Sequence, residues 1–487
     1  MFLFKDIKQY HSDLRNNKTS CVTAVEHYQH QIEENRILNA FTEVYKKEAL
    51  KKAAELDEKR KHGGPLKKLH GVVIAIKDVI CYKDHSATAA SKILEGFKSL
   101  YTATALQRLL DEDAIIIGNC NCDEFAMGSS NENSVYGNTL NALDHTRVPG
   151  GSSGGSAVAV QAGLCMASLG SDTGGSVRQP ADFCGIIGLK PTYGTISRYG
   201  LIAYASSFDQ IGIFSKSVDD LALLLDIVSG ADEYDSTASP NPSQGRGLKQ
   251  CDSFTLSAGS EKKYKIAYFK EAIHHPALDK EIKENILSLI DTLRSNGHTV
   301  TEIDFDLLDY VVPAYYVLTT AEASSNLSRY DGIRFGHQPK NDINDLTDFY
   351  KQARSNAFGK EVQRRIMLGT FVLSSGYYDA YFSKAQQVRR LLCNRTNAVF
   401  VEFDALIMPT SPTTAFPFGD KTSDPIAMYL ADIFTVFANL TGIPGISVPL
   451  FWHSNGMPFG LQIMTQKTDE LTLLQIADLM MKKYRGN

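Results

Sequence analysis

The chain has 487 residues, of which 43% are hydrophobic, and this is enough material for a large buried core. Its 50 lysines and arginines against 55 aspartates and glutamates give a net charge of -5, so the charge provides no general attraction to nucleic acids or anionic membranes. The eight cysteines are scattered, and the one close pair, Cys120 and Cys122, has neither the spacing nor the neighbouring histidines of a zinc site.

Helices alternate with buried strands through the first half of the sequence. Residues 20–60 predict two helices, because Ser20 is a helix start signal and the second run of helix formers ends at Gly63 and Gly64. The pattern then predicts a strand at 72–76, a helix at 103–113, a strand at 114–118, a helix at 156–164, a strand at 165–171 and a helix at 216–230. Alternation of this kind is typical of crossover units, so we expect an α/β layer.

The second half repeats this alternation around two less regular regions. Residues 232–262 are polar and rich in serine, proline and glycine, which predicts a surface excursion, and residues 313–400 predict a helix-rich lobe. The remaining patterns predict a strand at 264–270, a helix at 280–297, strands at 298–305, 404–412 and 445–451, and a closing helix at 470–484. With no internal repeat, we expect one domain over residues 1–487, with a helical N-terminal wrapping at 1–65 and a core at 66–230.

The segment at 149–181 is rich in glycine and serine, and three kinds of structure could account for this composition. A phosphate-binding loop requires a lysine after its last glycine, but Gly155 is followed by Ser156 and Ala157. A flexible linker would carry no buried helix or strand pattern, and this segment carries both. The scaffold of a serine hydrolase remains.

Two kinds of serine hydrolase fit the segment differently. "GSSGG" matches a nucleophile elbow centred on Ser153, but the preceding "ALDHTRVP" is not an apolar strand and no histidine lies in a recognisable triad context. A lysine can replace the histidine if burial lowers its pKa. Lys77 ends an apolar strand and suits that role; pairing with the adjacent Asp78 is the equally weighted alternative.

Residues 150–181 resemble the signature of the amidase signature family throughout their length. The resemblance implies an α/β fold with a large mixed central sheet covered by helices on both faces. It implies a catalytic triad of Ser176 in "DTGGSVR", Ser152 on a cis peptide in "PGGSSGG", and Lys77 in "GVVIAIKD". Neutral Lys77 would take a proton from Ser152, which would take one from Ser176, so that Ser176 can attack an amide carbonyl and form an acyl-enzyme.

The same resemblance gives roles to the neighbours of the triad. The oxyanion would be held by the backbone amides of Thr173, Gly174, Gly175 and Ser176. We expect Ser153 and Ser156 to be structural hydrogen-bonding residues, and Asp172 and Arg178 to support the loop.

Within the family, the chain is similar to the glutamine-hydrolysing subunits of tRNA-dependent amidotransferases, in blocks such as "DEFAMGSSNENSVYGNT" and "GIPGISVPL". This similarity implies a cytoplasmic chain without its own cofactor or metal, in a heterotrimer with subunits B and C. Ammonia released from glutamine would pass to a partner that activates misacylated Glu-tRNA(Gln), or Asp-tRNA(Asn), with ATP and magnesium. Glutamine would be bound by Met127, Gly128, Ser129, Tyr316, Arg365 and Asp432.

Two other functions and two departures from the family pattern accompany this interpretation. The same triad would serve a stand-alone amidase acting on small or aliphatic amides, and an assembly subunit without activity is a third, weaker alternative. The loop at 81–91 and Asp182 differ from the residues that the family leads us to expect. Neither difference touches the triad.

Overall fold

The computed structural model describes residues 2–238, 262–339, 343–421 and 425–485. Its strands form one 11-stranded sheet in the order β1-β3-β2-β4-β6-β5-β10-β11-β9-β7-β8. The strands are β1 (Phe41–Val44), β2 (Val73–Lys77), β3 (Ile115–Cys120), β4 (Ala167–Ser171), β5 (Ile187–Lys190), β6 (Ile211–Ser215), β7 (Lys265–Phe269), β8 (Thr299–Ile303), β9 (Ala405–Pro409), β10 (Gly445–Trp452) and β11 (Pro458–Met464).

The α-helices of the described residues include those expected from the sequence, together with further short ones. They are α1 (Ile7–Arg15), α2 (Cys21–Glu34), α3 (Lys46–Lys61), α4 (Thr104–Asp111), α5 (Gly154–Gln161), α6 (Arg178–Cys184), α7 (Val218–Val228), α10 (Lys270–Ile273), α11 (Lys280–Ser295), α12 (Val311–Asn326), α13 (Leu346–Ala357), α14 (Lys360–Val372), α15 (Lys384–Glu402), α16 (Pro425–Leu430), α17 (Val436–Thr441) and α18 (Glu470–Lys483). None of the helices in these ranges is both long and apolar enough to cross a membrane.

The sheet is mixed because two kinds of connection build it. β2 runs parallel to both β3 and β4, as crossover connections require, and β7 runs parallel to β8 and β9. β10 and β11 form an antiparallel pair that continues to β5 on one side and β9 on the other. Every residue of β2 is buried, which is typical of a parallel strand covered on both faces. The large mixed sheet with helices on both faces is therefore confirmed.

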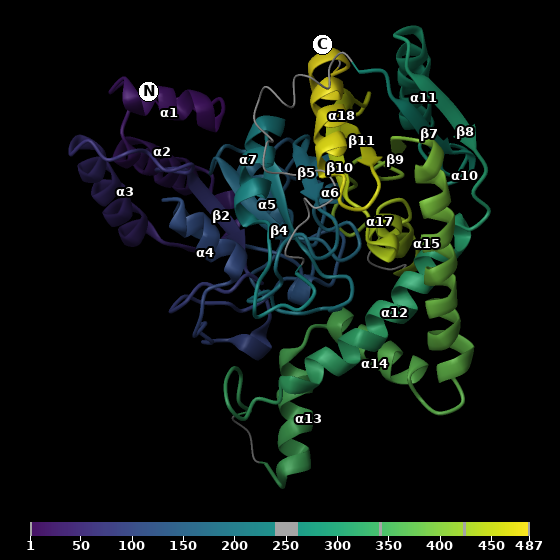
Figure 1. Cartoon of the computed structure of the whole chain (residues 1–487). Helices are drawn as coiled ribbons and strands as arrows, with labels where there is room; N and C mark the ends of the chain where they lie inside the picture. The colour runs from purple at the N-terminus through teal and green to yellow at the C-terminus, as the bar shows by residue number, and fades with distance from the viewer. Residues whose placement is uncertain (1, 239–261, 340–342, 422–424, 486–487) are drawn as a thin grey trace.

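The helices pack in separate groups around the sheet (Figure 1). α5 and α6 contact each other and the central strands, whereas α4, α7 and α18 form a row in which each contacts the next. α1, α2 and α3 lie at the end of the molecule that carries β1, and α12 to α15 project beside the sheet (Figure 1). The region 313–400 is helical, as expected, and residues 239–261 of the expected surface excursion lie outside the described residues.

Several elements differ from the expectation. β1, which was not predicted, lies between the two helices predicted within 20–60 and pairs with β3 through its backbone. The strands β5, β6 and β11 were not predicted. α1 falls within the helical wrapping expected at 1–65 but was not predicted as a separate helix, although its buried residues are spaced at one face of a helix: Ile7, Tyr10, His11 and Leu14. Short strands such as β5 carry too few residues for their own alternation to be seen, so only their pairing in the sheet identifies them.

Asp182, one of the two departures, lies fully inside the protein on α6. Its carboxylate accepts a hydrogen bond of 2.6 Å from the backbone N–H of Gly460, and it therefore ties α6 to β11. Burial raises the pKa of Asp182 to about 8.

Candidate active site

Lys77 is the last residue of β2 and is completely buried. Its ammonium nitrogen, Nζ, lies 2.6 Å from Ser152 Oγ, 2.9 Å from Ser153 Oγ and 2.9 Å from Ser171 Oγ. Burial away from water is the largest influence on this amine and lowers its pKa to about 8. The end of an apolar strand thus places a readily neutralised amine among three hydroxyl groups.

The alternative pairing of Lys77 with Asp78 is not formed. The Asp78 carboxylate instead accepts hydrogen bonds from the N–H and O–H of Thr88 and from the N–H of Ala90. Successive residues of a strand point to opposite faces, which separates the two side chains. The alternative of an ion pair between these neighbours is therefore ruled out, and the interpretation of Lys77 as an unpaired amine remains.

The hydrogen bonds of the Ser153 hydroxyl group determine one of the acceptors to which Lys77 donates. Ser153 Oγ donates to the backbone oxygen of Ser171 at 3.1 Å, so towards Lys77 it can only accept. A neutral amine has two hydrogens and one lone pair. One hydrogen of neutral Lys77 is thus directed at Ser153, and its other hydrogen and its lone pair are left for Ser152 and Ser171.

Ser152 lies on the other side of this amine and follows a cis peptide bond between Gly151 and Ser152. Ser152 is fully buried and Ser176 is 8% exposed, so Ser176 is the one that a substrate can reach more easily. No hydrogen bond joins the hydroxyls of these two serines within the described part of the chain. The structure brings Lys77 and Ser152 together, and Ser176 occupies the neighbouring loop.

That loop is wrapped around the buried Asp172. The Asp172 carboxylate accepts hydrogen bonds from the N–H of Gly175 at 2.9 Å and of Val177 at 3.1 Å, and it pairs with Arg178 at 3.0 Å. Burial by itself raises the pKa of Asp172, but the Arg178 guanidinium outweighs it, and the pKa falls to about 2. These contacts fit the supporting role expected for both residues.

The backbone amides expected to hold an oxyanion are not all free. The N–H of Gly175 donates to Asp172, so the expectation for this one amide is revised. The amides of Thr173, Gly174 and Ser176 have no acceptor among the described residues. A Cβ atom on Gly174 would collide with the hydroxyl of Tyr315, so the close approach of that ring requires glycine.

A second cluster gathers residues expected to bind glutamine. Ser129 Oγ donates to Asp432 Oδ2 at 2.6 Å, and Tyr316 Oη lies 3.5 Å from the same oxygen. Asp432 is 7% exposed, and burial raises its pKa to about 7. Met127 and Gly128 continue the backbone that leads to Ser129, and Met127 is fully buried.

Arg365 lies over the ring of Tyr316. Its guanidinium is 5.3 Å from the centre of the Tyr316 ring, and its Nη1 donates to Tyr204 Oη at 2.9 Å. Its Nε donates to Glu361 at 2.8 Å. Arg365 and Gly128 line a cleft of about 180 Å³, which also takes in Ser130, Glu132, Asn133, Lys360, Glu361, Arg364, Lys421, Met428 and Tyr429.

Three contacts join the second cluster to the catalytic loop. Gln179 accepts from the N–H of Gly151 and donates to the backbone oxygen of Ser129. Thr435 Oγ1 is 2.8 Å from the oxygen of Gly174. The structure therefore brings all the predicted site residues into one connected region.

The sequence interpretation missed several of these supporting residues. Gln179 lies inside the signature segment, where its position beside Arg178 was a usable signal. Ser171 lies in the same segment and had the same signal. Thr435 and Tyr204 gave no such signal, because their contacts depend on segments that are distant in the sequence.

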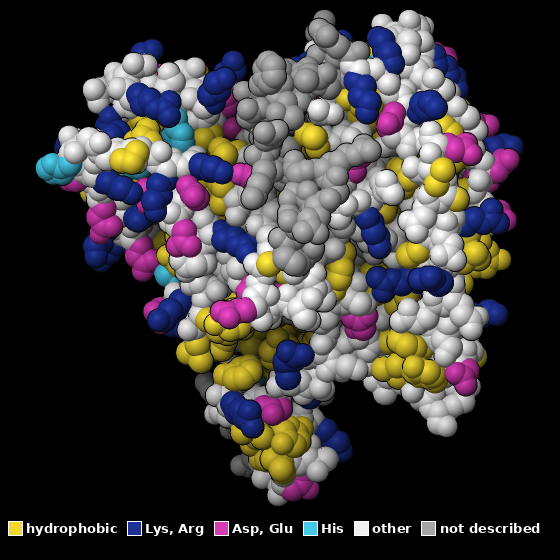
Figure 2. Space-filling model, in the orientation of Figure 1, with side chains coloured by type: hydrophobic (Ala, Val, Ile, Leu, Met, Phe, Trp, Pro, Cys, Tyr) yellow, Lys and Arg dark blue, Asp and Glu magenta, His cyan; other side chains and the backbone are white. Residues whose placement is uncertain are grey.

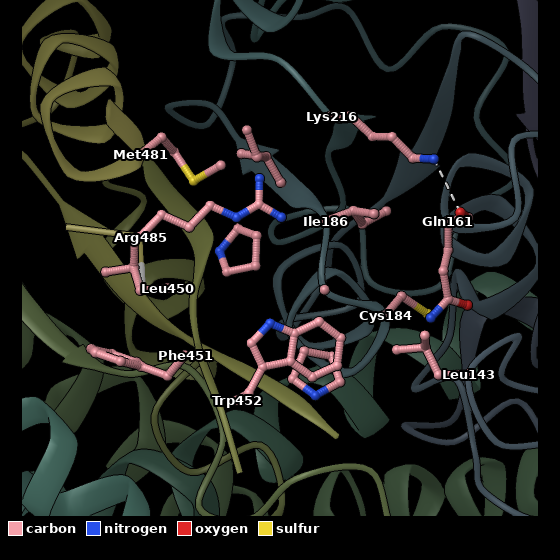
Figure 3. Close-up of a pocket in the computed structure, with 14 residues that line it drawn as sticks. Leu143, Gln161, Cys184, Ile186, Lys216, Leu450, Phe451, Trp452, Met481 and Arg485 are labelled. Carbon is pink, nitrogen blue, oxygen red and sulfur yellow. Dashed lines mark hydrogen bonds between the residues drawn. The ribbon is translucent and has the colours of Figure 1, made fainter. Parts of the chain in front are cut away.

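A further hollow of about 300 Å³ lies away from the predicted site residues, between α18, the β10–β11 pair and the end of α5 (Figure 3). Trp452 and Arg485 point towards this hollow, whereas Lys216 runs along its edge and donates through Nζ to the backbone oxygen of Gln161 (Figure 3). It contains none of the residues expected to act in catalysis or substrate binding. Within the described ranges no cluster of three or more metal-ligating side chains could hold a metal ion.

Comparison with known proteins gives the same family throughout. The model of the family described as Amidase matches residues 23–474. The A subunit of glutamyl-tRNA(Gln) amidotransferase from Chlorobium phaeobacteroides (strain DSM 266 / SMG 266 / 2430) is 47% identical over 477 residues, covering 98% of each chain. The protein of the same name from Staphylococcus haemolyticus is 46% identical over 476 residues, covering 97% of this chain and 96% of that protein.

Solved structures agree with the sequence relatives. The crystal structure of the glutamyl-tRNA(Gln) amidotransferase A subunit from Thermotoga maritima covers 99% of this chain and 95% of its own, with a TM-score of 0.77 and 37% identity. The native peptide amidase from Stenotrophomonas maltophilia covers 99% and 97%, with a TM-score of 0.81 and 26% identity. Since the family match and the sequence identity extend over nearly all its residues, the chain belongs to the amidase family.

Proposed function

We propose that this chain is the glutamine-hydrolysing subunit of a cytoplasmic tRNA-dependent amidotransferase and that it supplies ammonia for the conversion of misacylated Glu-tRNA(Gln) or Asp-tRNA(Asn). One observation carries the choice of substrate: a buried cation and a buried carboxylate both lie at Tyr316, Arg365 over its ring and Asp432 near its hydroxyl. A free α-amino acid requires both charges, one for its carboxylate and one for its ammonium group. A simple aliphatic amide requires neither.

The proposed chemistry starts at Lys77. In the proposed relay, neutral Lys77 directs its hydrogens at Ser153 and Ser171 and its lone pair at Ser152, which is the nearest of the three hydroxyls at 2.6 Å. Ser152 gives its proton to Lys77 and takes the proton of Ser176 as the Ser176 oxygen attacks the side-chain carbonyl carbon of glutamine. This step requires the Ser176 hydroxyl to reach Ser152.

The tetrahedral intermediate places negative charge on the former carbonyl oxygen. The unpaired amides of Thr173, Gly174 and Ser176 are the available donors, and one such donor is worth on the order of 3 kcal/mol. The proton held by Lys77 returns through Ser152 to the leaving nitrogen, which departs as ammonia. Water then attacks the γ-glutamyl ester of Ser176 through the same relay and releases glutamate.

The partners follow from the relatives, whose names make them the A subunit of glutamyl-tRNA(Gln) amidotransferase. In this proposal, subunits B and C complete a heterotrimer, and tRNA, ATP and magnesium are bound mainly by the partners. The chain itself uses no cofactor, because each step above transfers only protons and an acyl group between its own residues and glutamine.

The test is ammonia release from glutamine by the purified chain, alone and with subunits B and C, ATP and Glu-tRNA(Gln). Lys77→Ala and Ser176→Ala each should reduce glutamine-dependent turnover by about 10³-fold or more, while the same complexes given ammonium keep transamidation. Turnover of glutamine by Ser176→Ala at the parent rate would show that another residue is the nucleophile.

Asparagine and a simple aliphatic amide serve as control substrates. Selective release from glutamine, stimulated by the partners, supports the amidotransferase function. Rapid hydrolysis of the aliphatic amide by the chain alone would instead identify a stand-alone amidase, which the fold shared with the peptide amidase also accommodates.

A further inference from the structure

An exposed apolar patch lies where α14 turns into α15. Its members, named here the hairpin patch, are Met367, Phe371, Tyr377 and Tyr381, which are 72%, 42%, 44% and 43% exposed. The rings of Phe371 and Tyr377 have centres 4.4 Å apart, and Tyr381 lies 5.8 Å from Phe371. Figure 2 shows hydrophobic side chains gathered over this corner of the molecule.

The composition of the hairpin patch is typical of a protein interface. Tyrosine, phenylalanine and methionine are enriched at the centres of interfaces, where burial of a large side chain contributes much of the binding energy. Single exposed apolar residues are normal on a protein surface, whereas rings packed on one another and still exposed are not accounted for by the fold. A π-helical turn, Asp379–Ser383, carries Tyr381 at the start of α15, and such turns are frequent at functional sites.

The exposed charges of the segment that carries the hairpin patch, from α14 into α15, are mainly positive. Lys360, Arg364, Lys384 and Arg390 are exposed, and Asp379 is the exposed carboxylate of the same segment. Glu361 is engaged by the Nη1 of Arg364 and the Nε of Arg365. A partner that fits this surface therefore presents apolar side chains within a rim of aspartate and glutamate.

α14 has two faces with different roles. Val362, Arg365 and Gly369 face inward, and a Cβ atom on Gly369 would collide with the backbone oxygen of Thr320 on α12. Met367 and Phe371 face outward from the same helix. A protein seated on the outer face would contact the helix that positions Arg365.

We propose that the hairpin patch is the surface on which a partner subunit of the amidotransferase docks, through an apolar contact with an acidic rim. The inference rests on the proposed function, which makes this chain one subunit of a complex. It goes further by placing the contact on α14 and α15. Docking there orders the helix that carries Arg365 and so links partner binding to glutamine binding.

The experiment measures the dissociation constant between the full-length chain and the purified pair of subunits B and C by calorimetry. The variant Phe371→Ser with Tyr381→Ser should raise this constant by about tenfold or more. Its matched control is Val401→Ser with Trp452→Ser, which removes apolar side chains that are 84% and 58% exposed elsewhere and should leave the constant unchanged. Lys384→Glu should weaken binding and reduce its dependence on salt.

The outcomes separate this inference from the proposed function. If the parent chain neither binds the two subunits nor hydrolyses glutamine, the function fails and the inference with it. If the parent binds but the patch variant binds equally well, or the control loses as much affinity, the inference alone is overturned. If the parent chain sediments as a dimer and the patch variant as a monomer, the surface binds a second copy of this chain. That result would also overturn the inference.

Folding of the variants is checked by thermal unfolding and by glutamine hydrolysis without partners, both of which should match the parent. Met367→Lys replaces the most exposed side chain of the patch, at 72%, so it changes the surface with little effect on packing. It should reduce the affinity in the same direction as the double variant. Unchanged binding of this folded variant contradicts the proposal.

Discussion

Lys77 accepts a proton only in its neutral form, and its pKa of about 8 sets the pH at which that form appears. Asp432 binds an ammonium group only as a carboxylate, and its pKa is raised to about 7. Both groups therefore favour activity at higher pH. The ionisations of Lys77 and Asp432, whose pKa values lie close together, are therefore expected to set the pH dependence of activity.

We expect kcat/KM for glutamine to rise with pH through inflections near 7 and 8, because this parameter reports the ionisations of the free enzyme. Asp432→Asn should lower kcat/KM, remove the inflection near 7 and keep that near 8. The measurement is a pH profile of both enzymes. A profile that falls between pH 7 and 9 contradicts the assignment of Lys77 as the base.

The same shift affects stability. The pKa of Lys77 is about 8 in the fold against 10.5 in the unfolded chain, so the unfolded chain binds more protons between these values. The destabilising contribution of Lys77 is present below pH 8 and is removed as the pH rises towards 10.5. Lys77→Met should therefore stabilise the fold most at the lower pH values.

Ser153 and Ser156 offer a matched pair of variants. Each hydroxyl donates to a carbonyl oxygen of β4 at 3.1 Å, but only Ser153 also contacts Lys77. Alanine at either position should cost about 1 kcal/mol of unfolding free energy, whereas only Ser153→Ala should lower kcat. Urea unfolding and steady-state kinetics test this, and equal kcat in both variants would contradict the positioning role of Ser153.

At the scale of elements, the loop between β4 and α6 depends on one buried ion pair. Both Asp172 and Arg178 are fully buried, so loss of one charge leaves the other unpaired. Because the pKa of Asp172 is lowered to about 2, its contribution to stability is present above pH 3.8 and is lost as the pH falls through 2.

Asp172→Asn should lower the unfolding free energy at neutral pH by about 3 kcal/mol and abolish glutamine hydrolysis. Asp144→Asn is the control, since Asp144 and Arg147 form a partly exposed pair and its loss should cost less than about 1 kcal/mol. Denaturant unfolding gives both values. Similar losses of unfolding free energy in the two variants would mean that the buried pair contributes no more to stability than the partly exposed pair.

A second contact between elements joins the loop that leads to Met127 and Ser129 to the beginning of α14. Glu124 accepts a hydrogen bond of 2.8 Å from the N–H of Gly359, at the beginning of α14, and another from Ser91 Oγ. Burial raises the pKa of Glu124 to about 7. One carboxylate thus connects the backbone near Met127 to the helix of Arg365.

Glu124→Ala should raise KM for glutamine about fivefold with little change in kcat, the equivalent of a lost helix cap of roughly 1 kcal/mol. Hydrogen exchange at the first turn of α14 should become faster. Asp345→Ala, which removes the cap of α13, is the control and should leave KM unchanged. An unchanged KM in Glu124→Ala, despite faster exchange, would show that α14 does not limit glutamine binding.

At the scale of the whole molecule, the N-terminal helices are part of the core. Ile7, Tyr10 and Leu14 of α1 are at most 2% exposed, and the N–H of Ile7 donates to Asp220 on α7 at 3.0 Å. β1 extends the sheet at the same end. This segment is held by burial and by backbone pairing.

Deletion of residues 1–18 should reduce the unfolding free energy by about 5 kcal/mol, from the loss of three buried side chains at roughly 1.5 to 3 kcal/mol each. Thermal unfolding measures the loss, and Lys8→Ala, on the exposed face of α1, should leave the melting temperature unchanged. A truncated chain with the parent's melting temperature would contradict this account.

The sequence by itself determined the family, the alternation of helices and strands, and the residues Lys77, Ser152 and Ser176 as candidates. These depend on local patterns: an apolar run that ends in a lysine, and a contiguous segment of glycines and serines. The long, strongly apolar strands and helices were predicted for the same reason, since their period is contained in a few residues. Short strands such as β5 were not predicted, because only their pairing with neighbouring strands of the sheet identifies them.

Only the tertiary structure decided which side chains meet. Ser129 and Asp432 are 303 positions apart and share a hydrogen bond, and Arg365 reaches Tyr204 across 161 positions. The structure also shows that Asp78 accepts hydrogen bonds from Thr88 and does not pair with Lys77, and that the N–H of Gly175 donates to Asp172. The physical reason is that strand order and helix packing set distances between remote segments, and no local period of the sequence carries that information.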